Sequence, residues 1–386
     1  MKNYFSSDFK LGVLGGGQLG RMLLTETQKF DIYTLILDSS KEAPCAQICN
    51  EFHVGNLMDY DDVYNFGKQV DVLTIEIEHV NVNALAALEK EEIIVYPSSK
   101  SLRIIQNKGI QKQFFTDNQI PTSPFLRFDS LNSLQEKINS KKLTFPFVWK
   151  STQFGYDGTG VKIIKSADDL KSLPNVECIA EDLIPFKNEL AVIVARNKNG
   201  DIKTYPVVEM EFHPEKNQVE YVICPARISD KVALKAKEVA LKVVEAFEFV
   251  GILAVELFQT ENDQILVNEV APRTHNSGHY SIEASYTNQF EQHLRAILNL
   301  PLGNTESKVG GIMVNLVGED GFSGDVVYEN MNDILAIDGV TPHIYGKKET
   351  RPFRKMGHVT IVNKDIDGAR KTAEFVKKTI RVISKK

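Results

Sequence analysis

Short apolar runs alternate with helix-like patterns over the first hundred residues of the chain. In chain order they predict a strand at "KLGVLG", a helix over 18–29, a strand at "YTLILD", a helix over 59–69, a strand at "VDVLTIEIE", a helix over 81–90 and a strand at "IIVYPS". Because these strands are apolar along their length, we expect a parallel sheet covered by helices on both faces. Ligands of such sheets bind in the loops that follow the carboxyl ends of the strands.

The pattern changes after the two prolines of "NQIPTSPFLRF" (118–128). Strands with β-branched alternation now come in pairs, and the turns "NKNGD" (197–201) and "TENDQ" (260–264) contain the Asn, Asp and Gly residues that hairpins favour. Helices are predicted over 101–117, 230–248, 282–299 and, at the end of a strand-rich tail, roughly 366–380. We therefore expect an α+β middle region built on antiparallel hairpins and a smaller third region.

Composition narrows the kind of partner. With 386 residues the chain exceeds the usual size of a single domain. Its formal net charge is −6 and no basic tail is present. We therefore expect any phosphate group that it binds to belong to a small molecule and not to nucleic acid. The four cysteines lack C-x-x-C spacing, the amino terminus lacks a signal-peptide core, and no apolar stretch could span a bilayer. These features predict a cytoplasmic protein with no membrane partner.

A glycine-rich turn follows the first predicted strand, in "KLGVLGGGQLGRMLL". Gly15, Gly17 and Gly20 satisfy G-x-G-x-x-G, and Asp38 ends the next strand, where a dinucleotide-binding fold holds a ribose hydroxyl. The residues alone leave two interpretations open. The loop binds NAD, or it holds another phosphate at the start of the following helix.

A second glycine-rich segment, "FVWKSTQFGYDGTG" (147–160), follows the strand that contains Lys150. Glycines allow backbone N–H groups to turn toward a phosphate, and a lysine at the strand end adds a point charge. The segment is not a Walker A loop, since G-x-x-x-x-G-K-[ST] is absent. A phosphate-binding loop and an ordinary hairpin turn with a surface lysine both fit the residues.

Two glutamates flank the turn in "GILAVELFQTENDQILVNEVAPRTHNSGH" (251–279). Antiparallel pairing would bring Glu256 and Glu269 together on one face, and two such like charges favour a divalent cation between them. Asn268 adds a neutral oxygen, and this all-oxygen set favours Mg²⁺ over Zn²⁺. The alternative is a pair of solvated strand carboxylates.

Two polar clusters follow. Arg273, His275, Asn276, Ser277, Gly278 and His279 lie in one loop that suits recognition of a small anionic or heterocyclic substrate. The segment "YGKKETRPFRKMGH" (345–358) is rich in Lys and Arg within an acidic protein. It is either a phosphate clamp or a solvated basic loop.

In this order, "GGGQLGRM", "QKQFF…IPTSPF", "GYDGTG", "VNEVAPRTHNSGH" and "YGKKETRPFRKMGH" resemble the ATP-grasp superfamily and, within it, the 5-(carboxyamino)imidazole ribonucleotide synthases of purine biosynthesis. The resemblance covers nearly the whole chain. It implies a Rossmann-like parallel-sheet domain over 1–107, an ATP-grasp domain over 108–300, a small strand-rich domain over 301–386, and a homodimer.

The resemblance also implies roles for individual residues. The implied ATP-binding residues are Lys108, Lys150, Gly155, Tyr156, Asp157, Gly158, Thr159, Gly160, Val161, Glu181, Asp182, Leu183, Ile184, Glu189, His213, Asn268 and Glu269. The implied ribonucleotide-binding residues are Gly17, Gln18, Leu19, Glu78, Tyr156, Asp157, Arg273, His275, Asn276, Lys347 and Arg354. Arg273, His275 and Lys150 are the implied catalytic residues, and Glu256, Glu269 and Asn268 match the magnesium positions.

The implied reaction joins bicarbonate to the exocyclic amine of 5-aminoimidazole ribonucleotide through carboxyphosphate, with ATP converted to ADP and phosphate. Three alternatives stay open. A formate-using ATP-grasp transformylase would share the nucleotide half, an NAD-dependent dehydrogenase would fit the first forty residues, and a binding module without catalysis would consume no ATP.

Overall fold

The computed structural model describes residues 3–153, 160–214, 216 and 218–385. Its first sheet is parallel throughout, in the order β3-β2-β1-β4-β5. The elements are β1 (Lys10–Leu14), α1 (Gln18–Lys29), β2 (Tyr33–Asp38), β3 (Glu51–Val54), α2 (Tyr60–Gly67), β4 (Val72–Ile75), α3 (Val82–Lys90), β5 (Ile94–Val95) and α4 (Ser99–Ile105). The strand order reverses between β1 and β4, so the loops after these two strands share the ligand-binding edge of the sheet.

The middle of the chain builds two antiparallel layers. A four-stranded sheet has the order β6-β9-β7-β8, and a larger sheet begins β15-β14-β10-β12-β13, with β11 paired to β10. The elements are α5 (Lys108–Asp117), β6 (Phe125–Phe128), α6 (Leu131–Asn139), β7 (Phe147–Ser151), β8 (Val161–Ile164), a 3₁₀ helix (Ala167–Ser172), β9 (Cys178–Asp182), β10 (Phe186–Arg196), β11 (Ile202–Thr204), β12 (Val208–Phe212), β13 (Val219–Cys224), α7 (Asp230–Ala246), β14 (Gly251–Thr260), β15 (Ile265–Ala271), a 3₁₀ turn (Asn276–Gly278), α8 (Ser281–Ala284) and α9 (Gln289–Ile297).

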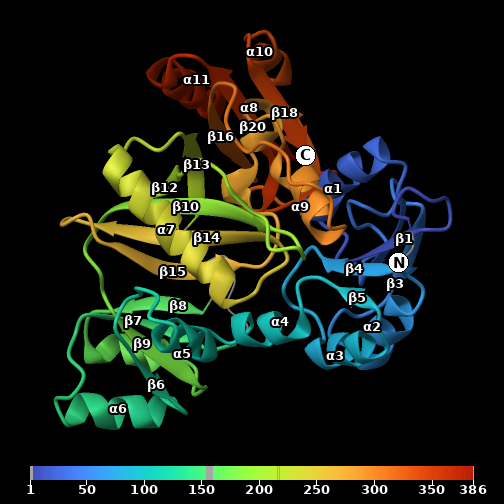
Figure 1. Ribbon diagram of the computed structural model, residues 1–386. Coiled ribbons are helices and arrows are strands. Elements are labelled where there is room, and N and C mark those ends of the chain that lie inside the picture. The colour runs from blue at the N-terminus through green and yellow to red at the C-terminus, as the bar shows by residue number, and fades with distance from the viewer. Residues whose placement is uncertain (1–2, 154–159, 215, 217, 386) are drawn as a thin grey trace.

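The last part of the chain continues the larger sheet. Strands β16, β20 and β18 extend it beyond β13, while β19, β17 and β21 form a small sheet of their own. The elements are β16 (Gly310–Val317), β17 (Gly324–Glu329), α10 (Met331–Leu335), β18 (Val340–Ile344), β19 (Glu349–Thr350), β20 (Lys355–Asn363), α11 (Ile366–Thr379) and β21 (Arg381–Ser384). Figure 1 shows these strands and α11 above the middle layers, with the N-terminal sheet to one side. The predicted boundaries at 107/108 and 300/301 stay predictions.

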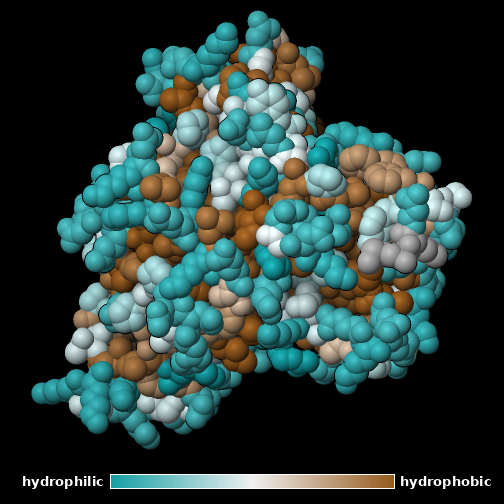
Figure 2. Space-filling model, in the orientation of Figure 1, coloured by the Kyte–Doolittle hydropathy of each residue, from teal (hydrophilic) through white to brown (hydrophobic). Residues whose placement is uncertain are grey.

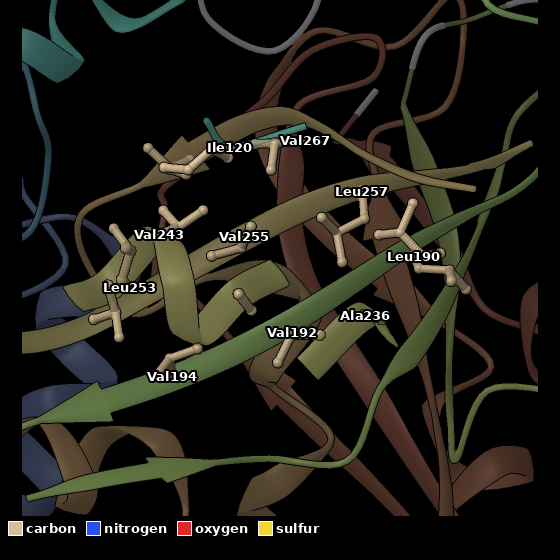
Figure 3. Close-up of a cluster of buried hydrophobic side chains, with 14 of the residues drawn as sticks. Ile120, Leu190, Val192, Val194, Ala236, Val243, Leu253, Val255, Leu257 and Val267 are labelled. Atoms are coloured by element: carbon tan, nitrogen blue, oxygen red, sulfur yellow. The ribbon is translucent and has the colours of Figure 1, made fainter. Parts of the chain in front are cut away.

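The largest buried cluster lies between α7 and the larger sheet (Figure 3). Alternate residues of β10 and β14 point toward the helix, as the two-residue period of a strand requires. Helix α7 packs small and β-branched residues at helical spacing against these strands, among them Ala236, Ala240 and Val243, all fully buried. On the outside, hydrophilic residues cover most of the face seen in Figure 2, and apolar residues show in the hollows between them.

The predicted fold class is confirmed, and the differences are local. The expected helix over 101–117 is two helices: α4 ends at Ile105, and Asn107 caps α5 by accepting a hydrogen bond from the Ile110 N–H. Asn288 likewise caps α9 and separates it from α8. Strand β3 was not predicted. Within the described ranges, no helix is both long and apolar enough to cross a membrane.

Candidate active site

The glycine loop after β1 lies at the switch point of the parallel sheet. Gly17 caps the start of α1, and the N–H groups of Gly16 and Leu19 donate to Asp38 Oδ2 (2.7 Å) and Glu76 Oε1 (3.0 Å). A Cβ at Gly17 would lie 2.6 Å from Glu76 Oε1, so only glycine leaves room for this carboxylate. Asp38 therefore holds the loop itself, which leaves the NAD interpretation without its ribose acid.

The basic segment near the carboxyl end packs against the start of α1, directly after this loop. A Cβ at Gly346 would lie 3.3 Å from Arg21 Nη1, and Tyr345 belongs to the same buried cluster as Leu19. Gln18, one turn before Arg21, begins α1 and is half-buried. The two segments, more than 300 residues apart in sequence, thus meet at the edge where parallel sheets bind ligands.

Lys347 and Arg354 make contacts within the basic segment. Lys347 Nζ donates to the carbonyl oxygen of Lys355 (2.7 Å), and Arg354 Nη1 donates to the carbonyl oxygen of Glu349 (2.5 Å). Lys355, which the sequence analysis did not select, lies close enough to lower the pKa of His275, after the larger effects of burial and of Arg273. The basic segment therefore reaches the loop that follows β15.

Glu256 and Glu269 face each other across β14 and β15, in register. The register shifts there because Asn268 is an extra residue, so that Leu257 pairs with Val267 but Glu256 pairs with Glu269. Without this bulge, Glu269 would point to the opposite face of the sheet. The side chains are 15% and 39% exposed, which makes them part of a wall that solvent reaches.

Two lysines neighbour this carboxylate pair. Lys108 Nζ donates to Glu269 Oε2 at 2.6 Å and lowers the pKa of Glu269, whereas burial and the neighbouring Glu269 raise the pKa of Glu256. Lys150 Nζ donates to Asn268 Oδ1 (3.1 Å) and lies 3.2 Å from Glu181 Oε2. Both lysines are largely buried, so their charges are weakly screened by solvent.

The residues predicted to contact adenine and ribose lie at the end of β9, in the turn that follows it and on β10. Glu181 is buried at the end of β9, while Asp182 and Leu183 are exposed and Ile184 is half-buried. Burial, reinforced by Glu269, raises the pKa of Glu189 on β10 to about 7.

The predicted ATP-site histidine lies on the hairpin between β12 and β13. His213 Nδ1 accepts a hydrogen bond from the Lys216 N–H (3.2 Å), and the His213 ring lies 6.4 Å from the Phe353 ring of the basic segment. Gly160 and Val161 lead into β8 beside Lys150, with the Gly160 carbonyl accepting from the Ser151 N–H. The predictions for Gly155, Tyr156, Asp157, Gly158 and Thr159 lie outside the described residues.

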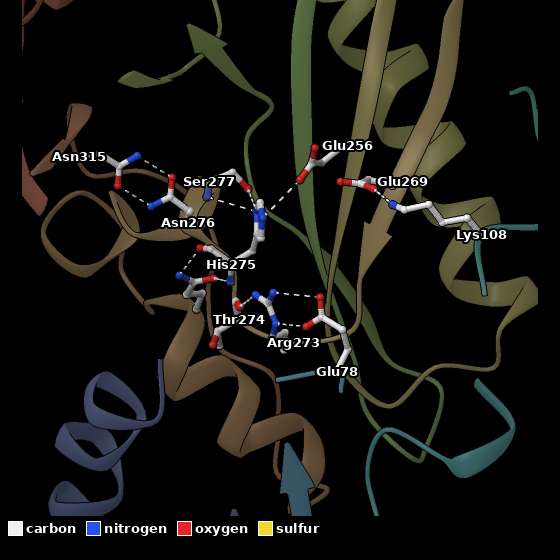
Figure 4. Close-up of polar contacts among 11 residues, drawn as sticks. Glu78, Lys108, Glu256, Glu269, Arg273, Thr274, His275, Asn276, Ser277 and Asn315 are labelled. Carbon is white, nitrogen blue, oxygen red and sulfur yellow. Dashed lines mark hydrogen bonds and ion pairs between the residues drawn. The ribbon is translucent and has the colours of Figure 1, made fainter. Parts of the chain in front are cut away.

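Arg273 and His275 continue the site from the end of β15 (Figure 4). Arg273 makes two hydrogen bonds to Glu78, from Nε (2.6 Å) and Nη2 (3.2 Å), which lower the pKa of Glu78 to about 2 despite its burial. His275 Nε2 lies 3.3 Å from Glu256 Oε1, and its Nδ1 accepts from the Ser277 N–H. Because Nδ1 is the acceptor, the ring proton is on Nε2 and faces the carboxylate.

The structure thus joins most of the predicted residues into one site. Asn276 and Asn315 exchange a reciprocal pair of amide hydrogen bonds (2.9 and 3.0 Å), which ties the loop to β16. Asn315 and Lys355 were missed. Glu76 follows β4 in the "TIEIEH" pattern that also contains Glu78, whereas Asn315 stands in a strand with no such signal.

The two carboxylates suit a Mg²⁺ ion that takes its other ligands from water and nucleotide phosphates. They do not form a metal site built from protein side chains alone. Over the part of the chain that the structure describes, no three His, Cys, Asp or Glu side chains converge as a metal cage. Mg²⁺ is commonly held by one or two carboxylates together with water and nucleotide phosphates. The facing pair Glu256 and Glu269, with the Asn268 oxygen beside it, offers that partial set of hard oxygen ligands.

Comparison with known proteins bears on this arrangement. Three family models match in order: ribonucleotide synthetase preATP-grasp domain over residues 9–106, ATP-grasp domain over 113–290, and phosphoribosylaminoimidazole carboxylase C-terminal domain over 311–372. The N5-carboxyaminoimidazole ribonucleotide synthase of Bacillus subtilis is 35% identical over 361 residues, which cover 92% of each chain. The chain belongs to the N5-carboxyaminoimidazole ribonucleotide synthase family.

Solved structures of this family agree with the fold. The crystal structure of the synthetase from Thermotoga maritima has a TM-score of 0.90 and 43% identity, covering 98% of this chain and all of that one. The family member from Aspergillus clavatus, in complex with ADP and 5-aminoimidazole ribonucleotide, has a TM-score of 0.87 and 34% identity, covering 96% and 98% of the two chains.

Some proteins similar to this chain are longer than it is. The phosphoribosylaminoimidazole carboxylase of Candida glabrata is 38% identical over 379 residues, which cover 95% of this chain. This chain spans 65% of the length of that protein.

Proposed function

We propose that the protein carboxylates the exocyclic amine of 5-aminoimidazole ribonucleotide, using ATP and bicarbonate and releasing ADP and phosphate. The observation that carries the proposal is the facing pair Glu256 and Glu269, with Lys108 on one side and His275 on the other. An acidic pair flanked by lysines suits a nucleotide with its cation, and family membership supports the carboxylating reaction.

The ATP half of the proposed site is built from two lysines and the carboxylate pair. Lys108 and Lys150 contact ATP phosphates, and Gly155–Val161 are predicted to contact them too. Glu181–Ile184 lie along the adenine edge, Glu189 at the ribose and His213 beside the nucleotide. Mg²⁺, held by Glu256, Glu269 and Asn268, supplies charge neutralisation on the phosphate oxygens when bound. The neighbouring ammonium groups of Lys108 and Lys150, which are themselves largely buried, add to that neutralisation.

The bicarbonate half centres on Arg273 and His275. Glu78 fixes the guanidinium of Arg273 through two hydrogen bonds, which orients it without rotamer freedom. Burial and the nearby Arg273 lower the pKa of His275 to about 3, so the imidazole is neutral at pH 7. We assign these two residues to holding bicarbonate and steering the proton that the amine loses.

The ribonucleotide half joins both ends of the chain. Gly17, Gln18 and Leu19 at the start of α1, with Lys347 and Arg354 of the basic segment, hold the 5′-phosphate. Asn276 and the predicted Tyr156 and Asp157 complete the pocket. The N–H of Leu19 already donates to Glu76. We therefore assign the main phosphate contacts to Gln18 and Lys347.

The proposed reaction has two bond-forming steps. A bicarbonate oxygen attacks the γ-phosphorus of ATP and ADP leaves, which gives carboxyphosphate. Carboxyphosphate breaks its C–O bond to release CO₂ and phosphate, and the amine nitrogen attacks CO₂ and loses a proton to give the carboxyamino product. Exclusion of water by the closed site protects the short-lived intermediate.

The test is ADP formation by the purified protein with each substrate omitted in turn. We expect ADP only when bicarbonate and 5-aminoimidazole ribonucleotide are both present, and none when formate replaces bicarbonate. ADP formation with formate would favour the transformylase, and tight NADH binding would favour a dehydrogenase. Absence of ATP consumption under every condition would favour a binding module.

We further propose that the protein acts in the cytoplasm as a homodimer. Light scattering after size-exclusion chromatography tests the second point. A mass of one chain, 43.4 kDa, at working concentrations would contradict it.

A further inference from the structure

A lysine outside the predicted site is buried beside the proposed ATP-binding residues. Lys112 lies on α5, and its side chain is 2% exposed. Its ammonium donates to Thr122 Oγ1 (2.6 Å) and Ser123 Oγ (2.7 Å), and lies 3.4 Å from Glu181 Oε1. A buried ammonium is costly unless paired and hydrogen-bonded, and this one is both.

Glu181 is shared between two lysines. Its Oε2 lies 3.2 Å from Lys150 Nζ and accepts a hydrogen bond from Ser123 Oγ (2.9 Å), while its Oε1 faces Lys112. The side chains of Glu181, Lys150 and Lys112 are 4%, 9% and 2% exposed, so the three charges interact with little screening. Although burial opposes it, Lys150 and Lys112 lower the pKa of Glu181, which stays ionised.

The charge balance of these three groups decides what Lys150 can offer to a ligand. With Lys150 and Glu181 alone, one ammonium and one carboxylate would neutralise each other. Lys112 adds a second ammonium, so the cluster carries one net positive charge next to the site. Lys150 also donates to Asn268, which directs its ammonium toward the predicted nucleotide contacts.

We propose that Lys112 is a positioning residue for ATP binding: it holds Glu181 from the buried side and offsets its charge, so that Lys150 keeps a net positive charge for the phosphates. This inference rests on the proposed function, because it assumes that Lys150 contacts the nucleotide. A purely structural role would be served as well by an apolar residue of similar volume, since buried ion pairs seldom stabilise more than apolar packing does.

The contacts of Lys112 also fasten the elements around the site. Thr122, which accepts from Lys112, donates to the carbonyl oxygen of Val267, the residue before Asn268. Ser123 is likewise bound to both Lys112 and Glu181. Lys112 thus connects α5 to β9 and to the bulge of β15, which carries two of the three predicted magnesium ligands, Asn268 and Glu269.

The experiment compares ligands with and without phosphates. Binding of ADP with Mg²⁺ and of adenosine is measured by calorimetry at pH 7 for the wild type, for Lys112→Met and for Lys100→Met, whose side chain is 78% exposed on α4. For Lys112→Met we expect the Kd of ADP to rise at least tenfold and that of adenosine to rise far less, since Glu181 also borders the predicted adenine edge. Lys100→Met should match the wild type for both ligands.

Several outcomes would overturn the inference. An ADP Kd within twofold of the wild type would show that the charge of Lys112 does not reach the phosphates. Equal losses for ADP and adenosine would show a structural role at the adenine pocket. A wild type that binds no ADP would instead refute the proposed function, so the two failures are distinguishable.

A second variant keeps the test decisive if Lys112→Met folds poorly. Ser123→Ala keeps both charges but removes the hydroxyl that is hydrogen-bonded to both Lys112 and Glu181. It should weaken ADP binding threefold or more and adenosine binding far less; equal effects on both would also overturn the inference.

Discussion

The ion pair between Glu78 and Arg273 gives the most quantitative test of how the site is held. It joins the loop after β4 to the loop after β15, with two hydrogen bonds of 2.6 and 3.2 Å and side chains 22% and 19% exposed. The change Glu78→Gln keeps the shape of the side chain but removes its charge. The amide has one acceptor oxygen, so at most one of the two hydrogen bonds from the guanidinium can remain. The perturbation therefore falls on one interaction.

The expected cost follows from burial and geometry. Hydrogen bonds to charged groups contribute roughly 1.5–3 kcal/mol, and loss of one partner from a fully buried pair costs roughly 3–5 kcal/mol. Because about a fifth of each side chain is exposed, we expect ~2 kcal/mol for Glu78→Gln. If the same loss reaches the transition state through a loosened Arg273, kcat/KM for bicarbonate falls about 30-fold.

The assay combines thermal unfolding with steady-state kinetics, and a matched control is at hand. Glu42 pairs with Lys348 at the same 2.6 Å, but the two side chains are 62% and 59% exposed. A surface pair of this kind contributes roughly 0.2–1 kcal/mol, so Glu42→Gln should lower the melting temperature far less than Glu78→Gln. Equal shifts for the two variants, or an unchanged kcat/KM for bicarbonate in Glu78→Gln, would refute the reasoning.

Three further perturbations test other parts of the site. Glu269→Gln removes one of the facing carboxylates and the partner of Lys108, so we expect kcat to fall about a hundredfold or more; near-normal turnover would remove the magnesium assignment. Lys347→Ala should raise the KM for the ribonucleotide roughly tenfold or more while leaving the KM for ATP unchanged, and equal rises would contradict a phosphate clamp. His293 is buried between Thr74 and the Ile252 N–H, and burial lowers its pKa to about 4. The unfolded chain binds this proton near pH 6.5 and the folded chain only near pH 4, so stability falls by ~1.4 kcal/mol per pH unit as the pH drops through that range. His293→Gln should therefore lose less melting temperature than the wild type over that range. Parallel curves of melting temperature against pH for the two proteins would contradict this expectation.

The sequence was most informative where local pattern determines structure. The apolar strands and the glycine turn predicted the parallel sheet, and the "TENDQ" turn between two strands brought Glu256 and Glu269 into one hairpin. The bulge at Asn268 was beyond reach, because Asn268 and Glu269 break the alternation of β15 without showing which of the two residues is the extra one. That bulge is what turns Glu269 to the face of Glu256.

Long-range contacts account for what the sequence did not reveal. Glu76 fills the glycine loop from a strand 57 residues further along the chain, and Lys112 joins Glu181 across 69 residues. Neither contact follows from spacing, because it depends on how strands order themselves in a sheet and how layers stack. The continuation of the larger sheet by β16, β20 and β18 has the same origin.

Transfer of isotopic oxygen tests the central claim, that one site phosphorylates bicarbonate before it carboxylates the amine. Turnover is run with ¹⁸O-labelled bicarbonate, ATP and 5-aminoimidazole ribonucleotide, and the phosphate released is analysed by mass spectrometry. The attacking oxygen stays on phosphorus when carboxyphosphate breaks, so the account predicts one ¹⁸O atom in each phosphate. Phosphate free of ¹⁸O, formed together with carboxylated product, would contradict it.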